Sequence, residues 1–174
     1  GGRKIAKFLV AGGHERISFI AGWEGAMTQR DRETGFRQGL EEAGVELFSR
    51  ASGEFDTEKA KAAARDLFGQ SPYPDAVFVA NDHMAFAVMD VLRFELGLSI
   101  PDDVSVVGFD DVSIAAWSSF SLTTVRQRAN LMVDEAVNMM LKRIKSPDTS
   151  FDSVSVEAPL IIRGSARIPK GWTT

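Results

Sequence analysis

Short apolar runs rich in β-branched and aromatic residues alternate along this chain with segments of helical periodicity. The runs over residues 17–21, 76–80 and 104–109 are apolar at nearly every position. A strand that is apolar throughout is buried on both faces, as in a parallel sheet that helices cover on both sides. The pattern therefore predicts an α/β fold with a doubly wound, mostly parallel sheet.

The spacing of apolar residues, together with helix-start and helix-stop signals, predicts the order of elements. Strands are expected over residues 17–21, 45–51, 76–80, 104–109, 122–125, 154–156 and 160–162. Helices are expected over residues 3–10, about 28–43, 57–68, 84–96 and 131–144, with Pro147 closing the last. A capping-box spacing from Thr28 begins the second helix. We expect Asp56 or Thr57 to cap the third and Asp82 to cap the fourth.

The charge balance of the chain weighs against a free-standing DNA-binding module. The chain has 174 residues, of which 44% are hydrophobic, so one substantial core is expected. Its net charge is −4 and its pI is about 5.2. A free-standing DNA-binding module normally carries a basic face that neutralises phosphates. We therefore expect no direct DNA contact by these residues.

The chain has no cysteine, so it has no disulfide framework, thiolate metal site or cysteine nucleophile. This is compatible with a reducing cytoplasm, although many periplasmic proteins also lack cysteine. No apolar run approaches the roughly 18 residues of a membrane-spanning helix, and the first residues do not resemble a signal peptide. We expect no membrane partner. A helix that begins near Arg3 without a cap suggests a truncated start.

Polar side chains follow the predicted strands, where ligands bind in open α/β sheets. These residues are Gly22, Trp23, Glu24, Thr28, Arg30, Arg32, Ser52, Gly53, Glu54, Phe55, Asn81, Asp82, His83, Asp110, Asp111, Arg126 and Gln127. They include arginines, amides, carboxylates and aromatic rings. Such groups suit a polyhydroxylated or planar small molecule.

Two charged candidates each have an alternative structural interpretation. Arg32 can clamp two adjacent hydroxyls with its planar donors, or it can pair with Asp31 or Glu33 on a helix surface. Asp110 can accept hydrogen bonds from a ligand, or it can cap the next helix. Of the two neighbouring carboxylates, Asp111 is the preferred cap.

The uncharged candidates are equally open. Asn81 can contact a ligand or satisfy its own turn. Phe55 can stack on a ligand or pack in the core. We expect His14 to be a loop residue and His83 a helix-start residue, with neither acting as a ligand or catalytic group.

Enzyme signatures are missing from the sequence. It lacks G-x-G-x-x-G, G-x-x-x-x-G-K-S/T, G-x-S-x-G and H-E-x-x-H. The paired carboxylates at 102–103 lie in a turn, and no histidine accompanies those at 110–111. We predict no catalytic residue, no metal site and no cofactor.

Several segments together resemble the LacI family of transcriptional regulators. Residues 80–85 read A-N-D-H-M-A and match the family's A-N-D-x-M-A. Residues 101–111 read P-D-D-V-S-V-V-G-F-D-D and match P-x-D-V/I-S-V/I-V/I-G-F/Y-D-D/N throughout. Residues 122–127 match L-T-T-V/I-x-Q, residues 32–36 match R-x-x-G-F/W, and residues 12–17 resemble G-H-x-x-I. The resemblance covers residues 1 to about 167.

The resemblance implies a periplasmic-binding-protein-like (type I) fold, in which two similar α/β subdomains close on an effector. On this template residues 18–127 and 157–168 form the carboxyl-side subdomain. Residues 1–17 and 128–156 are elements of the amino-side subdomain, and residues 169–174 form a tail. The rest of that subdomain and the helix-turn-helix lie outside this sequence, so half of the family's cleft is missing.

The resemblance also implies a site and its partners. The residues that match the family's effector contacts are Arg32, Asn81, Asp110 and Gln127, with Phe55 as the stacking aromatic and Arg30 as an additional candidate. The effector is expected to be a sugar or sugar derivative, although nucleobases also occur in the family. Binding would shift subdomain closure and so alter affinity for operator DNA, which is bound through the absent amino-terminal domain.

A cytoplasmic homodimer is the implied assembly, with residues 84–96 and 117–120 as its expected interface. Two other classes of protein remain as rivals. A periplasmic sugar-binding protein of an ABC transporter shares the fold and the strand-end site, but the motifs resemble the regulators more closely. An enzyme on this scaffold would need a base and a nucleophile that the sequence does not offer.

Overall fold

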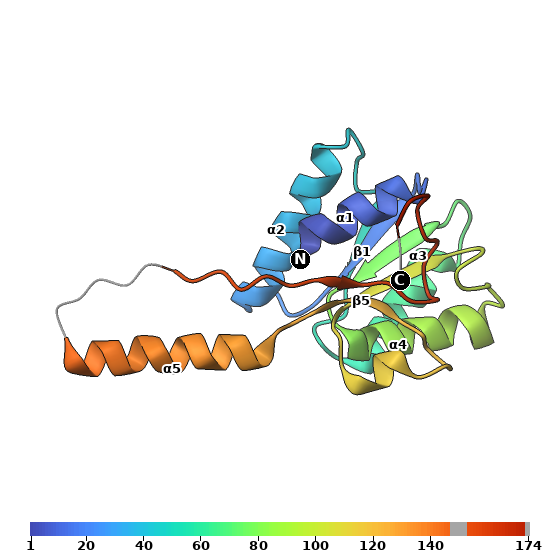
Figure 1. The fold of residues 1–174 in the computed structure, drawn as a ribbon. Coiled ribbons are helices and arrows are strands. Elements are labelled where there is room, and N and C mark those ends of the chain that lie inside the picture. Colours follow the sequence, from blue (N-terminus) through green and yellow to red (C-terminus); the bar gives the residue numbers. More distant parts are fainter. Residues whose placement is uncertain (147–152, 173–174) are drawn as a thin grey trace.

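Six strands form one sheet in the computed structural model, which describes residues 1–146 and 153–172 (Figure 1). Their order is β2-β1-β3-β4-β5-β6, and each neighbouring pair is parallel except β5 with β6. The strands are β1 (Ile17–Ala21), β2 (Ser49–Ser52), β3 (Ala76–Val79), β4 (Ser105–Asp110), β5 (Thr123–Arg126) and β6 (Leu160–Ile161). The predicted mostly parallel α/β sheet is therefore confirmed.

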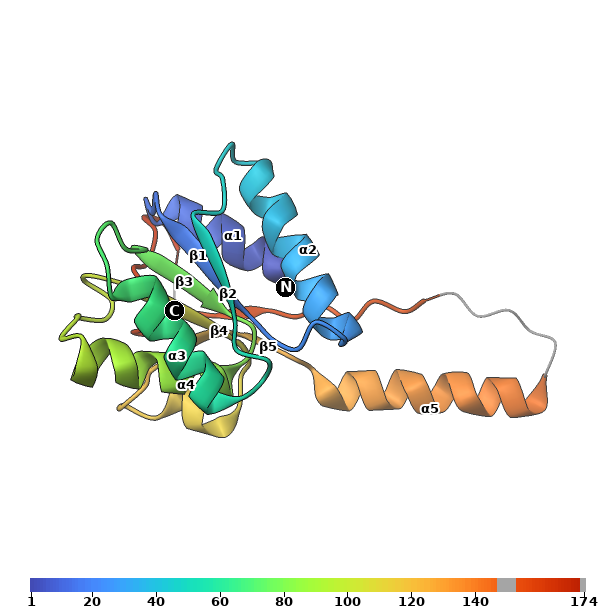
Figure 2. The same ribbon diagram turned by 180° about the vertical axis from the view of Figure 1, so that it is seen from behind.

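Helices cover both faces of the sheet. They are α1 (Gly2–Ala11), α2 (Met27–Glu41), α3 (Thr57–Phe68), α4 (Asp82–Asp90), the π-helical turn η1 (Val91–Glu95), the 3-10 turn η2 (Ser113–Ala116) and α5 (Ala129–Lys145). The pair α1 and α2 lies on one face, and the pair α3 and α4 lies on the other (Figure 2). The sheet is thus doubly wound, and its apolar strands are shielded from water on both sides.

A cluster of aromatic rings fills the core between the sheet and α2. The ring of Phe78 lies 4.9 Å from the rings of both Phe19 and Phe36, measured between centroids. Phe109 continues the cluster at 6.4 Å from Phe78. Tilted ring pairs of this kind add about 0.5–1.5 kcal/mol each beyond the burial of their area. Since Phe109 directly precedes Asp110, core packing fixes the end of β4.

Several predicted elements differ in extent from those observed. The strand predicted over residues 45–51 is observed as Ser49–Ser52, because the chain leaves α2 through a turn at residues 42–44 and pairs with β1 only from Ser49. The helix predicted over 84–96 is α4 followed by η1, whose hydrogen bonds span five residues. Residues 154–156 are not a strand, because they run beside α5 and away from the sheet. The predicted helix end at Pro147 lies outside the described residues.

The start of α3 agrees with the prediction, whereas the start of α2 does not. Asp56 caps α3 by accepting a hydrogen bond of 2.9 Å from the amide of Lys59, as expected. The capping box expected from Thr28 is wrong, since α2 begins at Met27 and has no side-chain cap. The side chain of Gln29 in the first turn of α2 instead accepts a hydrogen bond from the amide of Gly22, which joins the helix to the end of β1.

The structure places α1 differently from the predicted domain assignment. Residues 1–17 were assigned by resemblance to the amino-side subdomain. In the structure Ile5, Phe8 and Leu9 of α1 are fully buried in the same core as β1 and α2. An amphipathic helix ahead of β1 covers the part of the sheet face that α2 leaves open. Helix α1 is therefore part of the body that also contains the sheet.

Helix α5 projects from this body in both views (Figures 1 and 2). None of its 17 residues is buried. Its exposed large apolar side chains are Leu131, Met132, Val133, Val137, Met140, Leu141 and Ile144. Within residues 1–146 and 153–172, no helix is long and apolar enough to cross a membrane. The apolar surface of α5 is of the kind that normally packs against another part of a protein.

A buried histidine lies in the turn between α1 and β1. His14 is only 3% exposed, and its Nδ1 lies 3.3 Å from Oδ1 of Asp75 without the geometry of a hydrogen bond. The same carboxylate accepts hydrogen bonds of 3.2 Å from the amides of Glu15 and Arg16. Burial lowers the pKa of His14, and the charge of Arg167 lowers it further, whereas Asp75 opposes both. The native state therefore favours the neutral imidazole.

This burial predicts an acid-sensitive contribution to stability. In the unfolded chain the pKa of His14 returns to about 6.5. The contribution is thus complete above that pH and is lost as the pH falls toward the lower native pKa. We expect His14→Gln to reduce the loss of unfolding free energy between about pH 7.5 and 5, as measured by urea denaturation. The exposed His83 provides the control His83→Gln, and an equal effect of both substitutions would contradict the assignment.

Candidate functional site

The carboxyl ends of the parallel strands meet the amino ends of α2 and α4 at one edge of the sheet. In the register of β4 with β5, Asp110 lies beside Arg126, so Gln127 follows on the neighbouring strand. Arg32 reaches the same place from the second turn of α2. Three of the predicted ligand residues, Arg32, Asp110 and Gln127, are therefore brought together.

Arg32 is held between the core and this edge. Its side chain is 10% exposed, and its guanidinium carbon lies 4.1 Å from the centre of the Phe109 ring. One terminal nitrogen donates to Oδ1 of Asp110 at 3.0 Å, and the other donates to the backbone oxygen of Ala80. Burial lowers the pKa of Arg32, and the charge of Asp110 opposes this, so the guanidinium stays charged. Of the two interpretations left open, pairing with Asp31 or Glu33 is wrong.

Asp110 is the centre of the cluster. Its Oδ1 accepts hydrogen bonds from both Arg32 and the side-chain nitrogen of Gln127. Its side chain is 25% exposed, so it remains accessible from the open edge. Asp110 does not cap a helix, because η2 begins only at Ser113 and has no side-chain cap. The cluster can offer charged and neutral donors and a carboxylate to adjacent hydroxyl groups of a ligand.

The backbone is strained at this edge. Among the described residues, five other than glycine have positive φ, and four of them lie at or just after the carboxyl ends of β2 and β4. They are Glu54 (52°), Phe55 (60°), Asp110 (120°) and Asp111 (58°). Such conformations cost about 1–3 kcal/mol each and are concentrated at functional sites. Their position at a single edge supports the choice of this edge as the site.

Asn81 occupies the start of α4. Its Oδ1 accepts a hydrogen bond of 3.0 Å from the amide of Met84, so Asn81, and not Asp82, caps this helix. The interpretation that asparagine satisfies its own turn is therefore confirmed for this oxygen. The side-chain nitrogen and the second lone pair of Oδ1 are left for a ligand.

Phe55 lies at the end of β2, against the end of β1. Its ring covers Gly22 so closely that a Cβ at that position would lie 2.2 Å from ring carbons. Gly22 is thus required for this contact, since any larger residue would displace the ring. Phe55 is partly buried and packs against the core, so the interpretation of Phe55 as a core side chain accounts for its observed contacts.

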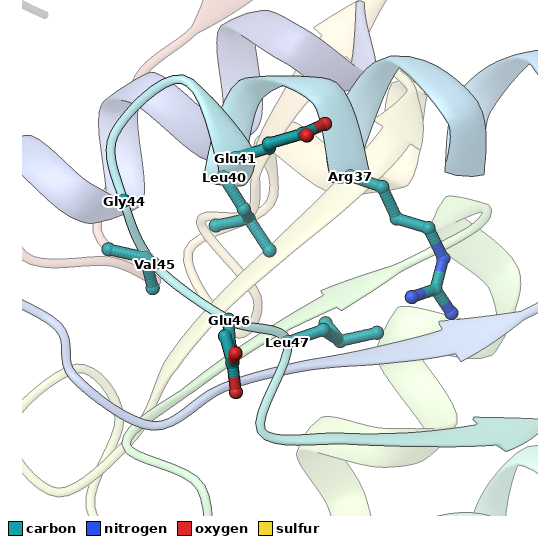
Figure 3. Close-up of a pocket in the computed structure, with 7 residues that line it drawn as sticks. All are labelled: Arg37, Leu40, Glu41, Gly44, Val45, Glu46 and Leu47. Carbon is teal, nitrogen blue, oxygen red and sulfur yellow. The ribbon is translucent and has the colours of Figure 1, made fainter.

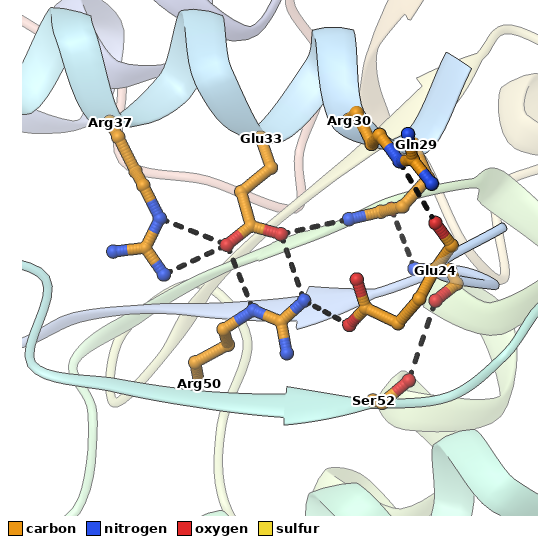
Figure 4. Close-up of polar contacts among 8 residues, drawn as sticks. Glu24, Gln29, Arg30, Glu33, Arg37, Arg50 and Ser52 are labelled. Atoms are coloured by element: carbon orange, nitrogen blue, oxygen red, sulfur yellow. Dashed lines mark hydrogen bonds and ion pairs between the residues drawn. The ribbon is translucent and has the colours of Figure 1, made fainter. Parts of the chain in front are cut away.

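Arg30 and its surroundings shape the loop between β1 and α2 (Figure 4). The exposed side chain of Arg30 donates to the backbone oxygen of Glu24 at 3.2 Å, so its observed contact is within the loop. Gln29, which the sequence analysis did not single out, is fully buried and accepts a hydrogen bond of 2.7 Å from the amide of Gly22. Its helical position next to polar residues gave no sign of burial.

A network of charged side chains joins this loop to α2 and β2. The carboxylate of Glu33 accepts hydrogen bonds from Arg37 at 2.9 Å and from Arg50 at 2.8 Å. Arg50 also pairs with Glu24 (Figure 4). Gln29 donates to Glu33 at 3.0 Å and so joins the network to the loop. Because the network connects the loop to α2 and β2, we assign it a structural role.

Asp82 is the second residue whose role the sequence did not indicate. It is fully buried, and its two oxygens accept hydrogen bonds of 2.6 Å from the hydroxyl of Thr124 and 2.9 Å from the amide of Val112. Burial raises its pKa to about 6, although both hydrogen bonds act in the opposite direction. The prediction that Asp82 caps α4 is wrong because its side chain points into the interior.

Asp111 is also not a helix cap. Its side chain is 4% exposed and forms ion pairs with Arg126 of β5 and Arg163, which follows β6. Arg163 also donates to the backbone oxygen of Leu122 at 2.7 Å. This buried carboxylate therefore ties together the two segments that connect α5 to the body.

A surface hollow of about 560 Å³ lies at the other end of α2 (Figure 3). It is lined by Arg37, Leu40, Glu41, Gly44, Val45, Glu46 and Leu47. None of the predicted ligand residues lines it, and it borders the turn that precedes β2. The hollow is therefore separate from the strand-end site.

Comparison with known proteins gives consistent matches over nearly the whole chain. The family description "Periplasmic binding protein-like domain" matches residues 6–166. The HTH-type transcriptional regulator CelR of Thermobifida fusca is 35% identical, over 95% of this chain and 49% of that protein. The HTH-type transcriptional repressor PurR of Photobacterium profundum is 30% identical, over 96% of this chain and 50% of that protein. The chain thus spans about half the length of the curated relatives it matches.

Solved structures show the same fold. A complex of the transcriptional regulator CelR with cellobiose superposes with a TM-score of 0.87 at 35% identity, over 95% of this chain and 51% of that one. A Lac repressor dimer bound to operator and the anti-inducer ONPF has a TM-score of 0.88 at 26% identity, over 95% of this chain and 57% of that one.

The raised pKa of Asp82 predicts a pH dependence opposite in sign to that of His14. The native state favours the protonated carboxyl, so this contribution is complete below about pH 4 and is lost as the pH rises through 6. We expect Asp82→Asn to remove up to roughly 3 kcal/mol of this pH dependence, as measured by urea denaturation between about pH 4 and 7. Asp66→Asn, at an exposed site on α3, is the control. An unchanged pH profile in Asp82→Asn would show that burial does not raise the pKa of this carboxyl in the native state.

Proposed function

We propose that this chain, which belongs to the LacI family of transcriptional regulators, forms the carboxyl-side wall of an effector-binding cleft. The parent protein would be a regulator that binds operator DNA through an amino-terminal helix-turn-helix. Effector binding would shift the closure of two subdomains and so change the affinity for DNA. The chain itself would supply effector contacts and a dimer surface.

The cluster of Arg32, Asp110 and Gln127 is the observation that carries this proposal. A buried guanidinium and an amide both donate to one oxygen of the Asp110 carboxylate, whose side chain is 25% exposed. A ligand with adjacent hydroxyls can exchange hydrogen bonds with all three groups at once, which favours a polyol over an apolar molecule. We keep Asn81 after β3, Phe55 after β2 and Arg30 in the first turn of α2 as further candidate contacts.

We infer that the effector is a sugar or sugar derivative. Exposed apolar side chains follow β1 near the predicted site, where Trp23 is 58% exposed and Met27 is 75% exposed. An indole can stack on the apolar face of a sugar ring. The complex of CelR with cellobiose is a related case, since that protein is 35% identical to this chain.

The projecting helix α5 fits a two-subdomain protein. Its apolar surface would be covered by the rest of an amino-side subdomain, to which we assign residues 128–156. The body would then comprise residues 1–127 and 157–168, with α1 included because of its buried side chains. The effector would lie between the two, at the edge where the chain crosses from one to the other.

A homodimer is proposed through residues 84–96 and 117–120. Phe94 is 81% exposed and Trp117 is 59% exposed. The rings of Phe86 and Phe120 lie 4.4 Å apart, so both segments form one continuous surface. Exposed aromatic side chains of this kind are enriched at protein interfaces.

A cytoplasmic location follows from the proposed regulatory function. A periplasmic receptor of an ABC transporter is the alternative, and an enzyme is a third class for which the site offers no base and nucleophile in contact. The gene region upstream of Gly1 separates the first two. A helix-turn-helix there supports the regulator, and a signal peptide there would favour the receptor while leaving the ligand site unchanged.

Substitutions at the cluster test the site. In the full-length protein we expect Arg32→Ala and Asp110→Ala each to weaken sugar binding by roughly 10–100-fold, because each removes charge-assisted hydrogen bonds. Isothermal titration with a sugar panel that includes cellobiose measures this. Arg65→Ala removes an exposed arginine of α3 that pairs with Glu95 of η1, and this variant should bind like the unaltered protein. Retained affinity in both cluster variants, with native melting curves, would refute the site.

Substitution of the exposed aromatics tests the dimer. We expect Phe94→Ser combined with Trp117→Ser to raise the dimer dissociation constant at least tenfold, since apolar area leaves the interface. Light scattering after gel filtration over a dilution series measures the change. Phe48→Ser, at a 40% exposed site near the opposite sheet edge, should leave the assembly intact. A dimer unaffected by the double substitution would require another interface.

A further inference from the structure

We propose that Asp82, which faces the interior and not the open site, is a positioning residue that holds the effector-binding groups of β4 and β5 in place. The inference rests on the proposed function, because it assigns a role to the same site. It goes beyond that function in naming a buried carboxylate as the group on which the geometry of the site depends.

The contacts of Asp82 join three separate elements. The residue itself begins α4, and Oδ1 accepts from the Thr124 hydroxyl of β5 at 2.6 Å. Oδ2 accepts from the Val112 amide, beyond β4, at 2.9 Å. Asp82 and Thr124 are both fully buried, so these bonds form away from water, where hydrogen bonds to a charged or polar acceptor are strongest.

A glycine in β4 makes room for this carboxylate. A Cβ at Gly108 would lie 2.3 Å from Oδ1 of Asp82 and 2.9 Å from a side-chain carbon of Leu122. Gly108 pairs directly with Thr124 in the parallel ladder of β4 and β5. The carboxylate therefore lies over a matched pair of positions on both strands, and its hydrogen bond to Thr124 helps to fix their register.

Each of these contacts is next to an effector-binding candidate. Asn81 immediately precedes Asp82, and Asp110 lies midway between Gly108 and Val112. Gln127 follows Thr124 by three residues. Movement of the carboxylate would displace all three candidates, because Asn81 adjoins Asp82 itself and the other two lie within three residues of the groups that the carboxylate contacts.

The neighbouring charges make this arrangement sensitive to substitution. Asp110 and Asp111 act on Asp82 as like charges, and Arg32 acts as the nearby opposite charge. Loss of the Thr124 hydroxyl would leave Oδ1 buried without its partner, which is costly inside a protein. The expected response is a shift of the loop after β4, and with it the orientation of Asp110.

Two adjacent threonines of β5 provide a matched test. Thr124→Val removes the hydroxyl that contacts Asp82, whereas Thr123→Val removes an equally buried hydroxyl that is bonded to the backbone of Arg163 at 2.9 and 3.2 Å. In the full-length protein we expect Thr124→Val to weaken cellobiose binding about tenfold, while Thr123→Val keeps the affinity. Thr124→Ser restores the hydroxyl and should restore binding. Melting curves of all three measure any general loss of stability.

Hydrogen–deuterium exchange supplies a readout that does not need a ligand. Peptides covering residues 109–113 and 125–128 should exchange faster in Thr124→Val than in Thr123→Val at equal thermal stability. If Thr124→Val fails to fold, Asp82→Asn takes its place. If cellobiose does not bind to the unaltered protein, that result counts against the proposed sugar, and the exchange data still decide the role of Asp82. Equal exchange and equal affinity in the two valine variants would overturn the proposal.

Discussion

The sheet is parallel from β2 to β5 and covered by helices on both faces, so charged side chains enter its interior where the strands end. Every buried carboxylate or guanidinium near the site lies at such an end, and each has a partner. Arg32 lies over Phe109 and contacts Asp110, while Asp82 contacts Thr124 from the start of α4. The cost of burying charge without a partner therefore determines which side chains can occupy this edge.

Two adjacent carboxylates at the end of β4 make different contacts. Asp110 faces the open edge and contacts Arg32 and Gln127, whereas Asp111 turns inward to Arg126 and Arg163. Successive side chains of an extended segment point to opposite faces, so these neighbours take different directions. One carboxylate is thus available to a ligand, and the other secures the strands beside it.

The sequence was sufficient for the sheet and for the principal cluster, and the reasons are physical. Uniformly apolar runs identify buried parallel strands, and polar residues at their ends identify the edge at which Arg32 and Asp110 meet. It was insufficient where two neighbouring residues offer the same chemistry. Asn81 and Asp82 are both good helix caps, and only the space left by Gly108 decides which side chain turns inward. The burial of Gln29 likewise depends on a loop that no local pattern describes.

The antiparallel pairing of β5 with β6 has a mechanical consequence. The chain leaves the body and returns to it along two neighbouring strands, with Val125 opposite Leu160, so both connections to α5 rise from one narrow ribbon. A helix of 17 residues is about 25 Å long. A rotation of about 5° at the ribbon would therefore move the far end of α5 by roughly 2 Å, given that length. Gln127 lies at the base of this lever, so a small rearrangement around Asp110 would be amplified along α5 without any change within the sheet.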